Sequence, residues 1–285
     1  MSGILYLCAT PIGNLGDMTN RCIETLREAD LIAAEDTRNT VKLLNHFGIE
    51  TPMTAYHEHN KYEKADKLVE KLLSGENIAL VTDAGTPGIS DPGEVLVKKC
   101  REQGIAVTSL PGCCALISAL ILSGLPTRRF CFEAFLPADK KERTAILEEL
   151  SDETRTILLY EAPHHLTGTL RELSEALGDR KIVLCRELTK KFEEVREFST
   201  IKEAADHYTE NVPKGEFVLV LPGISRRETE ESDREKWKEL SIEEHMEYYI
   251  GEGMDKKEAM KSVARDRGVS RRDVYRALLD SVKKV

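Results

Sequence analysis

The residues Asp83–Gly93 read Asp-Ala-Gly-Thr-Pro-Gly-Ile-Ser-Asp-Pro-Gly, and they follow a short apolar run at Ile78–Val81. The length and β-branching of that run are typical of a buried parallel strand. The three glycines of the segment allow positive φ angles and a close approach of the backbone to a ligand, and its two prolines fix φ and remove donors. A helix-like run, Glu94–Gln103, comes next. We therefore predict a shaped ligand-binding loop at the carboxyl end of a strand, with a plain surface turn as the alternative.

Apolar strand-like runs alternate with helix-like runs on both sides of this loop, which predicts an α/β fold with a mostly parallel sheet in its first half. Ser123–Pro126 interrupts the alternation and Pro222-Gly223 ends it. We predict an α/β domain over residues 1–123, a second over 124–223 and a helical tail over 224–285. The predicted strands are Ile4–Cys8, Leu31–Ala34, Met53–Tyr56, Ile78–Val81, Ile105–Leu110, Phe130–Phe135, Thr156–Tyr160, Ile182–Arg186, Glu194–Phe198 and Phe217–Leu221. One predicted helix starts at Thr19. The other predicted helices span Val41–His46, Tyr62–Leu73, Glu94–Gln103, Ala115–Leu122, Lys140–Leu150, His164–Leu177 and Ile201–Glu210.

The tail changes from an acidic composition over Arg226–Gly253 to a basic one over Met254–Val285. Asp255–Glu258 and Ser270–Asp273 are both capping-box patterns, and each predicts the start of a helix. The two helices, joined at Arg267–Val269, resemble a helix-turn-helix from about residue 254.

Helical spacing places Val274 and Leu278 on an inward face of the second tail helix. Arg272 and Arg276 share an outward face, because side chains four residues apart are neighbours on a helix. That face is either a solvated surface or an RNA contact.

Composition narrows the cellular compartment and the classes of partner that are possible for the protein. The 285 residues contain no apolar run long enough to span a membrane, and we expect no signal peptide at the N-terminus. The seven cysteines are odd in number and include no Cys-x-x-Cys pair, so we expect reduced thiols and a cytoplasmic protein. A net charge of −9 argues mildly against a general nucleic-acid binder but leaves room for a local basic surface.

The Asp83–Gly93 stretch resembles the cofactor loop of the tetrapyrrole-methylase-like (class III) methyltransferases, which use S-adenosylmethionine. Five further motifs resemble one branch of that family, which methylates the 2'-hydroxyl of a cytidine in small-subunit (16S) ribosomal RNA. The resemblance covers roughly residues 4–222 and is weaker in the tail. The five motifs are Thr10-Pro11-Ile12-Gly13-Asn14, Glu35-Asp36-Thr37-Arg38, Tyr56-His57-Glu58-His59-Asn60, Tyr160-Glu161-Ala162-Pro163-His164 and Arg186-Glu187-Leu188-Thr189-Lys190.

The resemblance implies a cofactor cleft between two α/β domains, a homodimer, and a ribosomal RNA or assembled small subunit as substrate. S-adenosylhomocysteine would be the product. Cys113-Cys114 stands where the family commonly has Pro-Ser, so contacts there are expected from the backbone, and His165 stands where the family often has Arg. The implied cofactor contacts are Pro11, Gly13, Asp83, Ala84, Gly85, Thr86, Pro87, Gly88, Ile89, Pro111, Gly112 and Ala115.

Methyl transfer to a ribose hydroxyl is an in-line displacement, which requires alignment and benefits from a nearby base, but needs no metal. Glu35 and Asp36, at the end of the second strand, are candidates for the base or for orienting the ribose. The alternative is a buried Asp36–Arg38 ion pair that shapes the loop. His57 and Glu58, after the third strand, are candidates for catalysis or substrate contact, or else for an interior hydrogen-bond network.

A metal site at His57-Glu58-His59 is disfavoured because no third and fourth ligands are evident. Four basic residues are candidates for RNA contact, with plain solvation as the alternative for lone lysines. They are Arg38, Lys190, Arg272 and Arg276.

Three other functions compete with this interpretation. A Rossmann dehydrogenase is disfavoured because the loop Thr10–Gly16 lacks the first glycine of the fingerprint and has Pro11 where a donor is required. Methylation of a tetrapyrrole or another small acceptor by the same fold and cofactor is the closer alternative. A catalytically silent RNA-binding module would not require the shaped loop.

Overall fold

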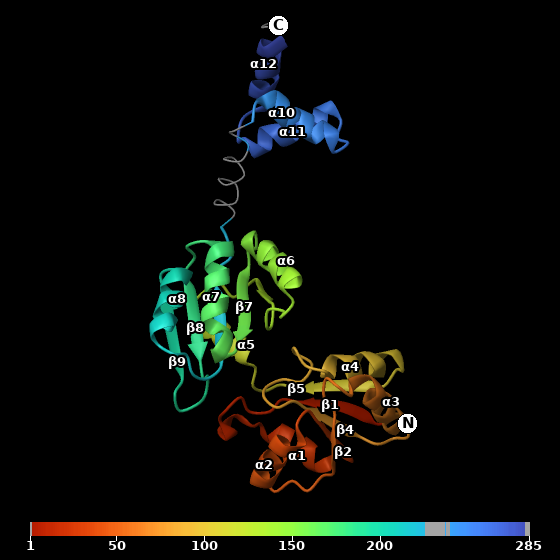
Figure 1. The fold of residues 1–285 in the computed structure, drawn as a ribbon. Helices are drawn as coiled ribbons and strands as arrows, with labels where there is room; N and C mark the ends of the chain where they lie inside the picture. Colours follow the sequence, from red (N-terminus) through yellow and green to blue (C-terminus); the bar gives the residue numbers. More distant parts are fainter. Residues whose placement is uncertain (1, 226–236, 238–239, 283–285) are drawn as a thin grey trace. The chain divides into compact units, whose positions relative to one another are not determined.

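The structure is a computed structural model that describes residues 2–225, 237 and 240–282, with side chains described up to residue 279. It contains two compact units, one formed by residues 1–147 and 156–222 and the other by residues 148–155 and 223–285. The larger unit holds two five-stranded sheets (Figure 1). The division into domains at residues 123/124 and 223/224 stays a prediction.

The first sheet is entirely parallel, as predicted, and its strand order is β3-β2-β4-β1-β5. β4 lies between β2 and β1, and all four of its residues are buried, as expected for a central strand with helices on both faces. The carboxyl ends of β2, β4, β1 and β5 therefore lie together at one edge. The strands are β1 (Ile4–Cys8), β2 (Leu31–Ala34), β3 (Met53–Ala55), β4 (Ile78–Val81) and β5 (Ala106–Leu110).

Two apolar clusters cover the two faces of this sheet. One contains Leu68 of α3 and Leu96 of α4, and the other contains Leu26 of α1 and Leu44 of α2. The helix α2 begins four residues before the predicted start because the Asp36 side chain caps it, accepting from the backbone N–H of Arg38. The elements are the 3-10 helix η1 (Leu15–Asp17), α1 (Asn20–Glu28), α2 (Thr37–Phe47), α3 (Lys61–Leu73) and α4 (Gly93–Glu102).

The second sheet has the order β6-β7-β10-β8-β9 and is mostly antiparallel, with only β6 and β7 parallel. β10, the last strand in sequence, is fully buried between β7 and β8. The β6 strand ends earlier than predicted, because Ala134 has φ +51° and leaves the extended region. The strands are β6 (Phe130–Phe132), β7 (Thr156–Glu161), β8 (Ile182–Arg186), β9 (Glu194–Phe198) and β10 (Phe217–Leu221).

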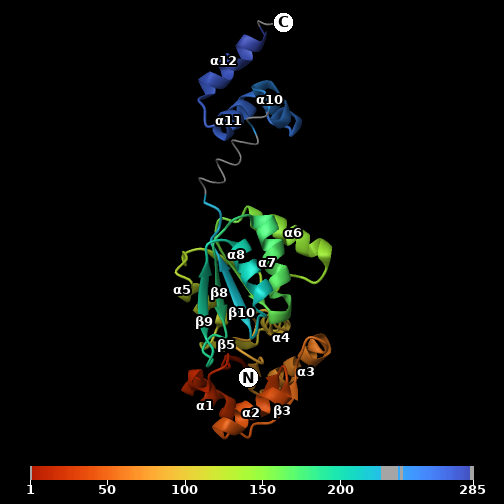
Figure 2. The same cartoon turned by 60° about the vertical axis from the view of Figure 1, so that its left-hand side comes forward.

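Helix α5 packs its Leu116, Ala119 and Leu120 against Leu158 and Val220 of the second sheet. Figure 2 shows α7 and α8 together on the opposite face of this sheet. α5 connects the end of β5 to this sheet, so it joins the two halves of the larger unit. The helices are α5 (Ala115–Leu122), α6 (Lys140–Ser151), α7 (Pro163–Leu177) and α8 (Ile201–Glu210).

Within its described residues 240–282, the tail contains the helices α10 (Ile242–Gly251), α11 (Lys256–Asp266) and α12 (Arg271–Val282). The two helices expected from the capping patterns are confirmed, whereas α10 was not predicted. Val274 is fully buried and Leu278 packs against the same cluster, as predicted. Arg272 and Arg276 are exposed. Residues 226–236, which belong to the acidic stretch, lie outside the described residues.

None of the described helices combines the length and the apolar character that crossing a bilayer requires.

Candidate active site

Hydrogen bonds to two neighbouring loops fix the Asp83–Gly93 loop. The backbone of Gly85 pairs with that of Thr10, with N–O distances of 2.9 and 3.0 Å, and so joins the loops after β4 and β1. The Thr86 hydroxyl donates to the backbone carbonyl of Cys113, 2.9 Å away, and joins the loop after β5. This contact uses the backbone of Cys113 and not its side chain.

Two side chains complete the support of the loop. The Asp91 carboxylate accepts from the backbone N–H groups of Gly88 (2.8 and 2.9 Å) and Gly93 (2.7 Å). The fully buried Tyr56 donates its hydroxyl proton to the carbonyl of Pro92, 2.8 Å away. Tyr56 therefore gives the motif after β3 a structural role, since it ties the end of that strand to the loop.

Backbone strain gathers around the same region. Gly85 and Gly88 have φ values of +86° and +87°, which a side chain disfavours. Among the described residues, positive φ outside glycine occurs at Ser90, Ala134, Glu187 and Thr189. Ser90 lines the cavity described next, and each of the other three residues is adjacent in sequence to a residue that lines it. Strained backbone of this kind concentrates at functional sites, so its position supports a binding role for the cavity.

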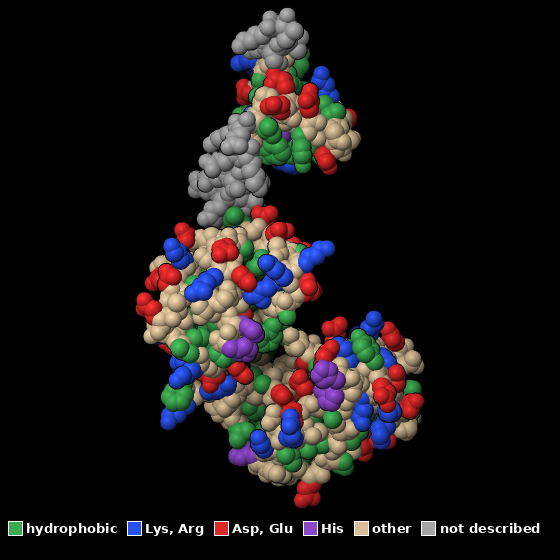
Figure 3. Space-filling view, in the orientation of Figure 1, with side chains coloured by type: hydrophobic (Ala, Val, Ile, Leu, Met, Phe, Trp, Pro, Cys, Tyr) green, Lys and Arg blue, Asp and Glu red, His purple; other side chains and the backbone are tan. Residues whose placement is uncertain are grey.

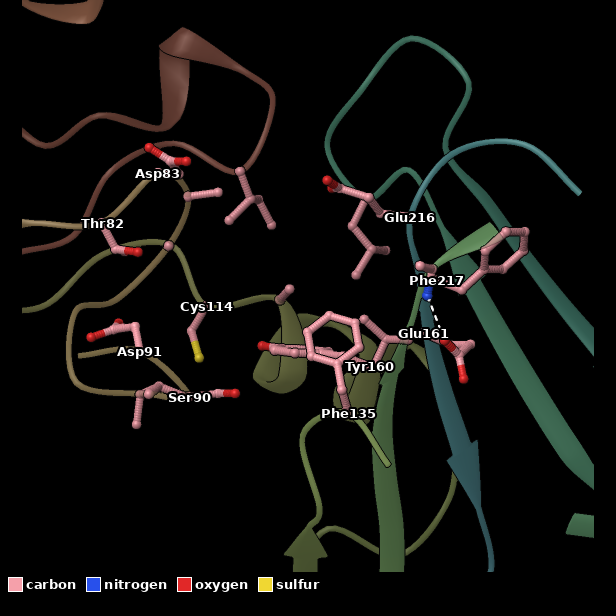
Figure 4. A pocket seen from close by; sticks show the side chains of 18 of the residues that line it. Thr82, Asp83, Ser90, Asp91, Cys114, Phe135, Tyr160, Glu161, Glu216 and Phe217 are labelled. Atoms are coloured by element: carbon pink, nitrogen blue, oxygen red, sulfur yellow. Dashed lines mark hydrogen bonds between the residues drawn. The ribbon is translucent and has the colours of Figure 1, made fainter. Parts of the chain in front are cut away.

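A cavity of about 450 Å³ opens beside the loop, within the size range of ligand pockets. Figure 4 shows Thr82, Asp83, Ser90, Asp91 and Cys114 on one side, facing residues of the second sheet on the other. The lining residues are Ile12, Glu35, Thr82, Asp83, Ala84, Gly85, Thr86, Ile89, Ser90, Asp91, Cys114, Ala115, Phe135, Tyr160, Glu161, Ala162, Pro163, Cys185, Leu188, Lys190, Glu216, Phe217 and Val218.

Carboxylates give the first-sheet side of the cavity a negative character. Glu35 accepts a 2.5 Å hydrogen bond from the Thr82 hydroxyl and a 3.3 Å bond from the backbone N–H of Asp83. Burial raises the pKa of Asp83, and the neighbouring carboxylates of Glu35 and Asp36 raise it further. Burial also raises the pKa of Asp91, against the backbone N–H bonds that stabilise its charge. A cationic ligand is favoured beside this wall.

The second-sheet side is largely apolar and aromatic. The rings of Phe135 and Tyr160 lie 5.7 Å apart, and more than half of the Phe135 side chain is exposed. Burial raises the pKa of Tyr160 to about 12, and its hydroxyl oxygen accepts from the backbone N–H of Leu116, 3.3 Å away. Glu161 is buried, and its oxygens accept from the Thr169 hydroxyl at 2.5 Å and the backbone N–H of Ala162 at 2.7 Å.

Lys190 reaches from the second sheet to the loop after β1. A Cβ atom placed on Gly13, which has φ +147°, would lie only 2.3 Å from Cγ of Lys190. The Lys190 ammonium donates to Glu187 at 2.9 Å and Glu216 at 3.0 Å. Burial opposes its charge, but these two bonds outweigh burial and raise the pKa of Lys190.

A smaller cavity of about 250 Å³ lies between the loop after β1 and the start of α2. It contains Pro11 and Gly13, which were predicted to bind the cofactor, and it shares Thr82 and Asp83 with the larger cavity. Its lining residues are Thr10, Pro11, Gly13, Leu15, Asn39, Thr40, Lys42, Leu43, Thr82 and Asp83.

The structure brings half of the twelve predicted cofactor residues together in one cavity. Asp83 to Thr86, Ile89 and Ala115 line the larger cavity. Pro87, Gly88, Pro111 and Gly112 are not among the described residues that line either cavity. Gly112 has a packing role, because a Cβ atom there would lie 2.6 Å from that of Ala9.

The predicted catalytic residues are separated. Glu35 lines the larger cavity, whereas Asp36, His57 and Glu58 line neither of the two. Asp36 caps α2 and pairs with the exposed Arg38, at 2.7 Å between Asp36 Oδ2 and Arg38 Nη2. Hydrogen bonds to Arg38 hold the pKa of Asp36 at about 2. The Asp36–Arg38 pair is thus present, but it is not buried as predicted, because the Arg38 side chain lies in solvent.

His57 and Glu58 interact with their own neighbours. The backbone N–H of His57 donates to the Asn60 side chain at 2.9 Å, and Glu58 pairs with Lys61. Their catalytic role stays a prediction. Among the residues that the structure describes, no group of three His, Cys, Asp or Glu side chains is placed to hold a metal ion.

The profile of the tetrapyrrole (corrin/porphyrin) methylases matches residues 5–205. The chain belongs to this family. Proteins named "Ribosomal RNA small subunit methyltransferase I" from Synechocystis sp. and Bacillus subtilis are 48% and 50% identical to it. The first alignment covers 98% of both chains, and the second covers 96% of this chain and 94% of the relative. A crystal structure of diphthine synthase, 16% identical, superposes with a TM-score of 0.62 over 77% of this chain and 90% of its own, which shows a shared fold.

The protein is therefore an S-adenosylmethionine-dependent methyltransferase, and the larger cavity suits that cofactor. S-adenosylmethionine combines an adenine ring with a cationic sulfonium and an amino-acid end. The Phe135 and Tyr160 wall suits the ring, and the Asp91 carboxylate suits the cationic groups. The backbone of Ala84 and Gly85 approaches the cavity without a large side chain in between.

Sequence reasoning missed much of the second wall. Tyr160 and Glu161 were noted at the end of a strand, but Phe135, Glu216 and Phe217 carried no motif beyond their place near strand ends. Asp91 was read only as part of the loop, although an Asp between two glycines in a turn is a typical backbone acceptor.

Proposed function

We propose that the protein transfers the methyl group of S-adenosylmethionine to the 2'-hydroxyl of a cytidine in small-subunit ribosomal RNA. The observation that carries this proposal is the supported Asp83–Gly93 loop, opening on a ligand-sized cavity. Near 50% identity to proteins named as ribosomal RNA methyltransferases supports the choice of RNA over a small acceptor.

The cofactor supplies a methyl group activated on a sulfonium, and the protein has to align an acceptor oxygen with it. Alignment of this kind is worth several kcal/mol. The bonds from Thr10, Thr86 and Tyr56 hold the loop at one wall of the cavity, so little reorganisation is needed when ligands bind.

RNA binding is proposed for the exposed Arg272 and Arg276 of α12 and, in the larger unit, for Arg38 and Lys190. Arg272 and Arg276 lie on one exposed face of α12, whereas Arg38 and Lys190 are paired with carboxylates. Over the face shown in Figure 3, Lys and Arg side chains are interspersed with Asp and Glu. RNA contact therefore depends on local groups rather than on the net charge of −9.

We further propose that the protein is cytoplasmic and homodimeric, and that it acts on free RNA or on the assembled small subunit. α5 presents Ile117, Ile121 and Leu122 to solvent, with exposed fractions of 44%, 66% and 47%. Exposed apolar side chains grouped on one helix are a common feature of subunit interfaces. Sedimentation of the purified protein at micromolar concentration tests the dimer, and a monomer would remove this part of the proposal.

The proposed activity is tested by transfer of tritium. Small ribosomal subunits from a strain without its own copy of this activity are incubated with the protein and labelled S-adenosylmethionine, and the RNA is digested and analysed by mass spectrometry. We expect one labelled ribose on a cytidine. Cofactor binding without label on RNA would overturn the RNA assignment and favour a tetrapyrrole or another small acceptor.

A further inference from the structure

The two cavities of the active-site region meet at the carboxyl end of β4. Among their described lining residues, only Thr82 and Asp83 are common to both. Thr82 is buried, and its hydroxyl is bound to Glu35 at 2.5 Å. Asp83 is exposed as a residue, although its carboxylate is partly buried, and it is accessible at the junction from both cavities.

The wall of the smaller cavity has the chemistry of a nucleotide site. Asn39 provides an amide that can both donate and accept, and Lys42 provides an exposed ammonium for a phosphate. No ion-pair partner of Lys42 is found among the described residues. Pro11 and Leu43 provide apolar surface for the face of a base. A volume of about 250 Å³ suits one nucleoside rather than a longer segment.

We propose that the smaller cavity holds the acceptor nucleoside and that Asp83 receives the proton of its hydroxyl. This inference rests on the proposed function and deepens it. The hydroxyl oxygen bonds to the methyl carbon, its proton passes to the Asp83 carboxylate, and the electron pair of the broken carbon–sulfur bond remains on sulfur. Methyl donor and acceptor would then meet beside the Asp83 carboxylate, where the two cavities share a wall.

The other carboxylates near the junction are already engaged. Asp91 holds two backbone N–H groups of its loop, and Glu161 holds Thr169 and a backbone N–H. Glu35 is bound to Thr82 and to the backbone of Asp83. Asp83 also accepts hydrogen bonds, from the backbone of Asp36 and from the Asn39 side chain. Of these four carboxylates, however, only Asp83 lines both cavities, which makes it the one best placed for the role.

The charges around Asp83 favour this role. Burial, Glu35 and Asp36 raise its pKa, while a backbone hydrogen bond from Asp36 and the Asn39 side chain act in the opposite direction. The Arg38 guanidinium also faces it. A carboxylate with a raised pKa that is still ionised near neutral pH is a better base than an ordinary aspartate.

The acceptor site is tested by filling it. Leu43→Trp places an indole in the smaller cavity, and Leu73→Trp on the exposed side of α3 is the matched control. Binding of fluorescently labelled, unmethylated small subunits is measured without cofactor. We expect at least tenfold weaker binding for Leu43→Trp, a change within twofold for Leu73→Trp, and unchanged S-adenosylhomocysteine affinity in both. Equal subunit affinity would overturn the assignment.

A second pair of variants covers the case in which Leu43→Trp does not fold. Lys42→Ala removes the ammonium at the cavity and Lys98→Ala removes an exposed one on α4. We expect weaker subunit binding for Lys42→Ala alone. Equal affinities of the two variants would contradict the site.

The role of Asp83 is tested with Asp83→Asn in single-turnover assays. We expect a rate about 100- to 10,000-fold lower, with cofactor and subunit affinities within threefold of the wild type. The wild-type rate should rise with pH until the carboxylate is ionised, and the variant should lose that rise. Loss of cofactor binding, or a retained pH profile, would overturn the role. If the wild-type protein itself fails to label subunits, the proposed function fails instead.

Discussion

Two substitutions of Gly85 distinguish the effect of backbone strain in the loop from the effect of filling the cavity in front of it. Gly85 has φ +86°, and a Cβ atom there would make only ordinary contacts, at 3.4 Å to Cγ2 of Ile12 and 3.5 Å to the carbonyl of Cys113. Gly85→Ala therefore adds backbone strain without a clash. The strain amounts to about 1–2 kcal/mol of unfolding free energy, which corresponds to a Tm lower by about 2–8 °C for a unit of this size.

Gly85→Arg adds a long side chain to the same strain. Because Gly85 lines the 450 Å³ cavity, we expect the arginine to extend into it and to displace the cofactor. The affinity for S-adenosylhomocysteine should fall more than about 100-fold, or about 2.8 kcal/mol. Gly85→Ala should lose far less, since its methyl group occupies little of the cavity.

Titration calorimetry and thermal unfolding measure the two effects on the same samples. Gly48→Arg is the matched control, because Gly48 has φ +61° at the end of α2 and open space around it. It should lower Tm as much as Gly85→Ala and leave cofactor affinity unchanged. Equal affinity of Gly85→Arg and Gly85→Ala would refute the placement of the cofactor beside this loop.

Further variants test the supports of the site. Tyr56→Phe leaves the Pro92 carbonyl without its buried donor and should lower unfolding free energy by about 1–3 kcal/mol in chemical denaturation; no change would show that water replaces the hydroxyl. Phe135→Ala should raise the Kd for S-adenosylhomocysteine by about three- to tenfold without a change in Tm; an unchanged Kd would remove Phe135 from the site. Arg272→Glu with Arg276→Glu should weaken subunit binding and reduce its salt slope by about 1.4; a slope equal to the wild type would identify a merely solvated face.

The first sheet and its ligand loop were predictable because the signals are local. A four-residue apolar run followed by glycines and prolines predicts a buried strand and then a loop with positive φ angles. β4 and the Asp83–Gly93 loop confirmed both. The start of α2 was misplaced, because Asp36 was read as a catalytic candidate rather than as a cap. A capping residue and a catalytic carboxylate look the same in a sequence.

The far wall of the cavity was less predictable because long-range pairing creates it. β10 is inserted between β7 and β8, which places Phe217 opposite Glu161 and Val218 opposite Tyr160, and nothing in either segment specifies that order. The bridge from Lys190 to Gly13 spans the two halves of the larger unit and depends on their packing. α10 was missed because its acidic composition masked a weak apolar periodicity.

The most direct test of the account is complementation in cells. A bacterial strain that lacks its own ribosomal RNA 2'-O-methyltransferase of this family receives the wild-type gene or the Gly85→Arg variant, and its small-subunit RNA is mapped by mass spectrometry. We expect one 2'-O-methylcytidine to be restored by the wild type and to be absent with the variant. A wild-type protein that is expressed, binds S-adenosylmethionine and restores no methylated ribose would contradict it.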